Sequence, residues 1–499
     1  MSKSLIVFDE PTLEFRYGQK LVDPRKGLSL FGPYDADQVS KPSALSYVVL
    51  GIPADISIFA TWSKAMSQSA TQAPKGNHHI WVPYPGYEAA FGMPWSSQPI
   101  RAFKLDSEKL LKASRKRDRH ERAYEVVNLY LEGLRIASKL DEKIGVAVCI
   151  VPDEVYSNCR PKSPVPVEAE GPNISTKQLL ARKFGQLELF DQYDPDQYWL
   201  STDFRRQLKA RAMEFNIPIQ IIRQSTLRFS DENKRGQRGL TPLSDRMWNL
   251  GTTLYYKCGG KPWRLVTARD GVCYIGIAFR RTDDKQTACC AAQMFLNDGD
   301  GVVFLGEYGP WYSPKTHQFH LDKSAARNLL RGVLDTYREL EGKELKEIFL
   351  HSRSELGKEE FEGFQEACPK NVKLVCIRVR QDNDNGIRLF RPGTMPIIRG
   401  SFLKIDDHQG YLWGSGFKPE LGTYDGWDTP IPLKITIQHG DAVVERVAQD
   451  ILGLTKLNYN TCKIGDGEPV TIGFSDAVGE ILISNPRVSH RKPNFKFYI

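Results

Sequence analysis

The chain has 499 residues, of which 41% are hydrophobic and 26% charged, which is typical of globular proteins and excludes a disordered or fibrous chain. This length is too great for one hydrophobic core and indicates two or three domains. No apolar run approaches the ~20 residues of a membrane span, and the nine cysteines show no paired metal spacing. We therefore expect a cytoplasmic protein without a membrane segment. A net charge of +8 is compatible with a polyanionic partner but does not by itself indicate one.

Residues 1–45 contain Pro24, Gly27 and Gly32-Pro33, which predict short strands and turns. Beyond this segment, continuous apolar runs alternate with stretches of helical apolar spacing. The predicted elements are a strand at 47–52, a helix at 56–66, helical spacing over 105–143, a strand at 144–151, a helix at 203–215, a strand at 218–222 and a helix at 245–256. This alternation predicts an α/β domain with a parallel, Rossmann-like sheet.

The turn Gly259-Gly-Lys-Pro262 predicts a domain boundary. From Val272 onward the pattern changes to two or three antiparallel strands followed by a long helix. The later predicted elements are a helix at 324–341, a strand at 347–351, a helix near Glu359, a strand at 372–379 and helices at 442–453 and 474–483. The second half is therefore a separate α/β domain.

The strand Cys273-Tyr-Ile-Gly-Ile-Ala-Phe-Arg280 is informative because of a residue that it lacks. In ribonuclease H-type nucleases, a strand of this kind carries an aspartate that helps to hold two Mg²⁺ ions. The candidate position here is Ala278, which cannot ligate a metal. After the strand that ends at Leu350, the segment around Arg353 has no aspartate either. Only Asp476 could occupy the last ligand position, and one carboxylate does not hold two Mg²⁺.

Two alternatives stay open for the acidic residues. Asp476 could simply begin a helix, where the helix dipole favours a negative charge. The chain could also be an active nuclease with an atypical acidic set formed by Glu307, Glu355 and Asp476.

Four polar residues have a spacing that suits a terminal phosphate. Arg205 and Lys209 are four residues apart and share one helix face, Gln220 lies in the next strand, and Lys257 ends the following helix. Terminal phosphates need several cations and hydrogen-bond donors that converge on one point. The alternative is an ordinary solvated helix face.

Two further segments have an open interpretation that involves charge. The C-terminal run Asn494-Phe-Lys-Phe-Tyr-Ile499 is apolar and aromatic, which predicts a docked terminus whose carboxylate needs a cation or a metal; a plain packed strand is the alternative. The stretch Arg115-Lys-Arg-Asp-Arg-His-Glu-Arg122 either contacts a nucleic-acid backbone or forms a solvated helix face.

Taken together, these residues resemble the short prokaryotic Argonautes, which consist of MID and PIWI domains and lack the N and PAZ domains. The resemblance runs from end to end. It is carried by Ile217-Pro-Ile-Gln220, Tyr255 to Trp263, Gly309-Pro-Trp311, Leu454-Thr-Lys-Leu-Asn-Tyr-Asn460 and Glu468-Pro-Val-Thr471. It implies an N-terminal segment over 1–45 that packs on the core, a MID domain over 46–265 and an inactive, ribonuclease H-like PIWI domain over 266–499.

The resemblance also implies a role for each of these residues. Arg205, Lys209, Gln220 and Lys257 occupy the places that bind the 5′ phosphate of a guide strand, with Asn249 as an addition. Many relatives have Tyr or His where this chain has Arg205, so the preferred 5′ nucleotide is open. In many relatives a Mg²⁺ ion bridges the phosphate and the C-terminal carboxylate, which here is that of Ile499.

A partner is implied as well. Short Argonautes act with a protein in which an APAZ domain is fused to an effector, which is most often a TIR domain and otherwise a sirtuin-like domain or a nuclease. The resemblance thus implies a guide-RNA-dependent sensor of invading single-stranded DNA in a prokaryotic immune system. We expect a heterodimer that oligomerises on activation, with NAD⁺ hydrolysis in the partner and no cleavage by this chain.

Overall fold

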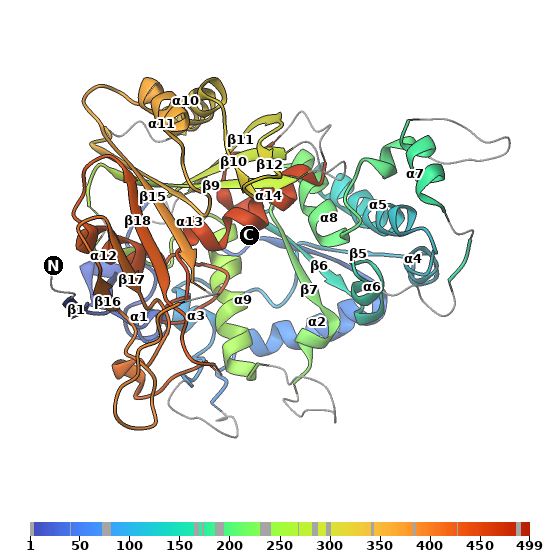
Figure 1. The fold of residues 1–499 in the computed structure, drawn as a ribbon. Helices are drawn as coiled ribbons and strands as arrows, with labels where there is room; N and C mark the ends of the chain where they lie inside the picture. The colour runs from blue at the N-terminus through green and yellow to red at the C-terminus, as the bar shows by residue number, and fades with distance from the viewer. Residues whose placement is uncertain are drawn as a thin grey trace.

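The computed structural model describes residues 4–39, 41–71, 81–163, 169–171, 174–184, 194–229, 241–267, 269–281, 288–295, 301–340, 344–382, 386–426, 428–485 and 491–499. Two large β-sheets lie side by side in this part of the chain (Figure 1). Within the same residues, none of the helices combines the length and the apolarity that a membrane span requires.

The first sheet has four parallel strands, of which the alternation of apolar runs predicts three and misses the strand Arg101–Lys104. They are β4 (Tyr47–Gly51), β5 (Arg101–Lys104), β6 (Val146–Val151) and β7 (Ile219–Arg223), in the order β5-β4-β6-β7. The surrounding helices are α2 (Pro53–Met66), α3 (Tyr87–Phe91), α4 (Ser107–Ser114), α5 (Arg119–Ala137), α6 (Asp153–Asn158), α7 (Thr176–Lys183), α8 (Phe204–Ala212) and α9 (Leu243–Lys257). The prediction of a Rossmann-like domain is confirmed.

The two faces of this sheet are both covered, which explains its continuous apolar strands. Val48 and Leu50 of β4 pack in one core with α4, α5 and α8. Tyr47 and Val49 point the other way, into a core that includes α2 and α9.

The single helical segment predicted over 105–143 is wrong, because two helices occupy it. Helix α4 ends at Ser114, and α5 begins only at Arg119. The interruption has a local cause: the Asp118 side chain accepts a hydrogen bond from the His120 backbone N–H (2.9 Å) and so caps a new helix.

The prediction of only strands and turns over 1–45 is also incomplete, because Pro24–Phe31 forms helix α1. Asp23 caps it by accepting from the Arg25 backbone N–H (2.9 Å), and Pro24 occupies the first turn, where proline is well tolerated. Gly27 is needed inside this helix because a Cβ atom there would lie 2.1 Å from the Phe15 ring. Pro24 therefore marks the start of a helix and Gly27 a close contact, and neither marks a turn.

The second sheet has nine strands in the order β1-β16-β17-β18-β15-β14-β9-β10-β11. Their bounds are β1 (Ser4–Val7), β9 (Val272–Arg281), β10 (Ala288–Phe295), β11 (Gly301–Gly309), β14 (Glu347–Ser352), β15 (Lys373–Gln381), β16 (Ser401–Lys404), β17 (Gln409–Leu412) and β18 (Leu433–His439). Strands β9, β10 and β11 are antiparallel, whereas β14 runs parallel to both β9 and β15. This arrangement is the ribonuclease H-like core.

Helices cover both faces of the nine-stranded sheet. Helices α10 (Lys323–Leu340) and α11 (Lys358–Ala367) share a core with Cys273, Ile275 and Ile277 of β9. On the other face, α12 (Val444–Leu454), α13 (Val470–Gly473) and α14 (Ser475–Ile483) pack in the core that contains Tyr274 and Ala278.

Gly276 allows α13 to approach β9 closely, because a Cβ atom at this position would lie only 2.0 Å from the Thr471 carbonyl oxygen. We expect Gly276→Ala to displace α13 and to destabilise the fold by about 1–3 kcal/mol, the usual cost of overpacking. A thermal unfolding curve measures this loss. Gly357→Ala is the matched control, because a Cβ atom there meets only the Glu360 carboxylate at 3.5 Å; equal melting temperatures for the two variants would contradict the prediction.

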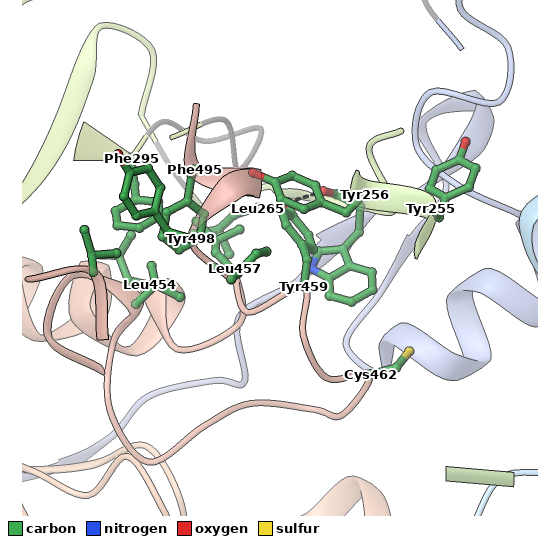
Figure 2. Close-up of a cluster of buried hydrophobic side chains, with 14 of the residues drawn as sticks. Tyr255, Tyr256, Leu265, Phe295, Leu454, Leu457, Tyr459, Cys462, Phe495 and Tyr498 are labelled. Carbon is green, nitrogen blue, oxygen red and sulfur yellow. Dashed lines mark hydrogen bonds between the residues drawn. The ribbon is translucent and has the colours of Figure 1, made fainter. Parts of the chain in front are cut away.

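One apolar core continues from the first sheet into the second (Figure 2). At the end of α9 the Tyr256 ring lies 4.7 Å from that of Tyr459, and the Tyr459 hydroxyl donates to the Trp263 carbonyl (2.9 Å). Phe495, near the C-terminus, packs edge-on against Phe295 of β10 at 5.0 Å. The segment that follows the predicted boundary at 259–262 is therefore buried between the two halves.

The N-terminal segment also connects the halves. Strand β1 pairs with β16 at the edge of the nine-stranded sheet, with Ser4 opposite Lys404. Strands β2 (Leu13–Glu14), β3 (Lys20–Leu21) and β8 (Arg264–Leu265) form a small separate sheet. Between them, the buried Glu10 carboxylate contacts Arg399 at 2.8 Å and Lys456 at 3.0 Å.

Candidate nucleic-acid interface

Helix α8 positions two of the predicted phosphate ligands. It begins after Asp203, whose carboxylate accepts from the backbone N–H groups of Arg205 (3.0 Å) and Arg206 (3.2 Å). Arg205 then lies exposed in the first turn, and Lys209 follows one turn later as a buried residue. The cap thus fixes where the shared face of Arg205 and Lys209 begins.

Lys209 and Lys257 are buried beneath this face without a carboxylate partner among the described residues. The Lys209 ammonium donates to the Tyr498 carbonyl (3.0 Å), next to the C-terminal residue. The Lys257 ammonium donates to the Ile219 carbonyl (2.7 Å) and to Oε1 of Gln220 (2.8 Å). An ammonium has three donors, so both lysines retain donor capacity.

The burial of these lysines changes their acidity. Burial, with the neighbouring Arg205 acting in the same direction, lowers the pKa of Lys257 to about 7. Burial also holds the pKa of Lys209 well below its ordinary value, and the charges of Lys257 and Arg205 lower it further. The three cations therefore lie close enough to repel one another. A bound anion would reduce this repulsion.

A cavity of about 340 Å³ adjoins Lys257 through Gln220, which lines the cavity and accepts the lysine's hydrogen bond. Arg205, Gln220 and Asn249 line it together, so the structure brings these three predicted residues to one place. Oδ1 of Asn249 accepts from the Cys462 backbone N–H (2.8 Å), which ties α9 to the second half of the chain. Lys209 and Lys257 are buried and are not among the described residues that line the cavity.

Sequence reasoning missed the aromatic part of this cavity. Trp62, Tyr156 and Arg223 also line it, and the Arg223 guanidinium lies 4.3 Å from the centre of the Tyr156 ring. A signal was available, because Tyr156 lies in α6, the short helix after β6, and Arg223 ends β7. Ligands of open parallel sheets bind outside the carboxyl ends of the strands.

The C-terminal run is docked, as its apolar composition predicts. Ile499 and Tyr498 are 4% and 3% exposed, and the C-terminus lies beside α8 and α14 (Figure 1). The Lys209–Tyr498 hydrogen bond brings the terminal residue to the edge of the cation cluster.

The three predicted nuclease positions meet at one end of β9. Ala278 is 3% exposed and faces α14, where a Cβ atom on Gly479 would lie 3.7 Å from that of Ala278. Strand β14 runs beside β9 with Ser352 opposite Ile277, so Arg353 follows at the level of Ala278. Arg353 forms an ion pair with Glu468 (3.0 Å), and Asp476 forms one with Arg280 (2.9 Å).

The alternative acidic set does not assemble. Asp476 is engaged by Arg280, Glu355 contacts Arg378 at 3.4 Å, and Glu307 accepts from the Asn328 amide at 2.8 Å. Among the described residues, no three His, Cys, Asp or Glu side chains come together in a way that could hold a metal ion.

Several cations of the basic stretch 115–122 form contacts within the chain, whereas Arg119 is exposed in the first turn of α5. Arg115 contacts Glu154 at 2.6 Å, and Lys116 contacts Glu121 at 2.6 Å. Arg122 is 3% exposed and donates to the Lys116 carbonyl (2.8 Å). These contacts stabilise the junction of α4 and α5, and contact of the stretch with a nucleic-acid backbone stays a prediction.

Comparison with known proteins assigns the fold. The chain covers 100% of its own length and 55% of that of a Clostridium butyricum Argonaute structure bound to a guide DNA and a 19-mer target DNA, with 17% identity and a TM-score of 0.61. It covers 99% of itself and 56% of a crystal structure of Aa-Ago with externally bound siRNA, with 15% identity and a TM-score of 0.57. A crystal structure of A. aeolicus Argonaute gives 16% identity and a TM-score of 0.55 over 95% of this chain and 52% of that one. The two domains are therefore the MID and PIWI folds of Argonautes.

Sequence comparison agrees with the fold. The curated protein argonaute of Aquifex aeolicus (strain VF5) is 24% identical over 307 residues, which are 60% of this chain and 38% of that protein. The chain is thus an Argonaute homologue that spans less than half of the curated relative. No protein-family model matches the chain.

Proposed function

We propose that this chain is a short, catalytically inactive Argonaute that senses invading single-stranded DNA through a guide RNA. In this proposal, the MID domain anchors the guide's 5′ phosphate, and base pairing reads the target sequence while the protein reads backbone and shape. Formation of the guide–target duplex then activates an APAZ effector protein.

The observation that carries the proposal is the cation cluster beneath the MID cavity. Arg205, Lys209 and Lys257 lie close together there, although Arg205 lowers the pKa of both lysines and Lys257 lowers that of Lys209, and the two buried ammonium groups donate to neutral acceptors. Clustered cations without a carboxylate are costly in a fold and suit a di-anionic ligand. The similar fold of an Argonaute bound to a guide and a target supports a nucleic acid as that ligand.

We also propose a Mg²⁺ ion at the phosphate, for which the C-terminal carboxylate is the protein ligand. Lys209 donates to the carbonyl of Tyr498, the neighbour of the buried Ile499, whose C-terminal carboxylate we propose as this ligand. Mg²⁺ typically takes one or two carboxylates together with substrate phosphates and retains water. Bound there, the ion would neutralise phosphate charge, and Ile499 would hold it.

The absence of cleavage is supported by the residues at the nuclease positions. Ala278 provides no ligand, Arg353 places a cation where a carboxylate is needed, and Asp476 is paired with Arg280. Output would therefore come from the partner, for which a TIR domain is favoured over a sirtuin-like domain or a nuclease. Its binding would form a heterodimer that oligomerises on activation.

The test is to purify the chain with its genomic neighbour and to add a 5′-phosphorylated guide RNA with complementary single-stranded DNA. NAD⁺ consumption and target cleavage are followed together. We expect NAD⁺ loss with an intact target. Cleavage by this chain alone would overturn the proposal, and cleavage only in the presence of the neighbour would make the effector a nuclease.

The pKa of Lys257 predicts how guide affinity depends on pH. Above pH 7, the approximate pKa of Lys257 in the free protein, the amine must take up a proton before it can pair with phosphate, and a bound phosphate raises that pKa. Affinity for a 5′-phosphorylated guide should therefore fall by up to about tenfold per unit as the pH rises above 7. Titrations between pH 7 and 8.5 avoid the protonation of the phosphate, whose second pKa is about 6. A 5′-hydroxyl guide is the control, and an equal fall for both guides would contradict the prediction.

A further inference from the structure

Helix α8 carries two pocket residues on one face and an ion pair to the PIWI domain on another. Arg206 follows Arg205 directly, and its guanidinium lies 2.6 Å from the Glu480 carboxylate of α14. The two side chains are 33% and 28% exposed. The contact joins the helix that presents Arg205 and Lys209 to a helix that packs on β9.

The ion pair belongs to a chain of alternating charges. On the MID side, the capping Asp203 lies 3.8 Å from Arg206 and 3.1 Å from Arg160. On the PIWI side, Arg280 of β9 lies 3.7 Å from Glu480 and 2.9 Å from Asp476. The charges alternate in sign from Arg160 to Asp476, so each side chain is held by the one before it.

The backbone follows the same path. The Ser201 N–H, just before α8, donates to the Ser484 carbonyl at the end of α14 (3.2 Å). Figure 1 shows α8 and α14 next to each other at the junction of the two domains. Together with the Lys209–Tyr498 hydrogen bond, the PIWI domain therefore contacts α8 at its N-terminal end and again one turn further along.

From this arrangement we propose that Arg206 and Glu480 are positioning residues for the phosphate pocket. They set the orientation of α8 on the PIWI domain, and so the place of Arg205 and Lys209, without touching the guide. Arg280 contacts Glu480 and is itself held by Asp476, so the predicted nuclease position Asp476 belongs to the same set of ion pairs. The inference rests on the proposed 5′-phosphate pocket.

The test is a double-mutant cycle read out as phosphate preference. The dissociation constants for 5′-phosphorylated and 5′-hydroxyl guides of one sequence are measured for the native chain, Arg206→Ala, Glu480→Ala and the double variant. We expect each single variant to reduce the preference on the order of fivefold, the effect of a well-formed exposed pair. The double variant should lose no more than either single variant, because the two side chains act as a unit.

Conservative and control variants separate positioning from loss of fold. Arg206→Lys keeps the charge and should retain most of the preference. Arg338→Ala removes a distant surface ion pair with Asp335 and should leave the preference unchanged. Unchanged preference in both single variants, or additive losses in the double variant, would overturn the inference.

A further variant distinguishes this inference from the proposed function. If Lys209→Met also leaves the preference for a 5′ phosphate unchanged, the pocket itself is misassigned. If Lys209→Met abolishes the preference while Arg206→Ala and Glu480→Ala retain it, the pocket stands and only the positioning role fails.

Discussion

Lys257→Met should weaken binding of a 5′-phosphorylated guide on the order of 100-fold, the upper range for losing a charge-assisted hydrogen bond. Methionine keeps most of the lysine's length but has no donor. Binding of a 5′-hydroxyl guide should change little, because the lost interaction is with the phosphate. Fluorescence anisotropy with paired guides measures both constants.

The same substitution should leave the fold intact. Lys257 is 0% exposed and has no carboxylate partner among the described residues, so removing its ammonium also removes a desolvation cost. The loss of a donor to Gln220 and to the Ile219 carbonyl offsets that gain. Lys112→Met, an exposed change of the same charge on α4, is the matched control. An equal loss for both guides would indicate a general effect on binding rather than phosphate recognition.

Glu10→Gln should lower the melting temperature on the order of 10 °C. Arg399 and Lys456 are 1% and 0% exposed in their side chains, and both contact the Glu10 carboxylate. Although burial opposes ionisation, these two cations lower the pKa of Glu10. Removing the carboxylate charge leaves the two buried cations uncompensated, at a cost of about 3–5 kcal/mol.

The pH dependence of this loss provides a second check. Burial lowers the pKa of Lys456 to about 8, although Glu10 raises it. Without Glu10, Lys456 can release its proton, so the destabilisation should be smaller above pH 8 than at pH 7. Glu420→Gln, an exposed change of the same kind, should leave the melting temperature within about 1 °C. A loss of the same size in both variants would contradict the role of Glu10.

The regular elements were predictable because their signals are local. The continuous apolar run of β6 and the Asp203 cap of α8 are sufficient to place a buried strand and a helix start. Helix α1 was missed although its Asp23 cap and Pro24 are equally local, because Gly27 suggested a turn. Glycine is required at position 27 by its close contact with the Phe15 ring, which lies outside the helix.

The site was predictable only in part. The spacing of Arg205 and Lys209 indicates a shared face, but spacing does not show that Lys209 is buried against Tyr498. The Arg206–Glu480 pair joins residues far apart in the chain, and such contacts leave no periodic signal in one sequence. Likewise, nothing in the run 115–122 reveals that Arg122 turns inward to the Lys116 carbonyl.

The pairing of β1 with β16 has a consequence for biosynthesis. Ser4 is synthesised 400 residues before its partner Lys404. At roughly 5–20 residues per second, β1 must wait roughly 20–80 s for its partner strand. During that interval Leu5 and Val7 form an unpaired apolar strand, which is a template for aggregation. This edge of the sheet can therefore form only after Lys404 has been made.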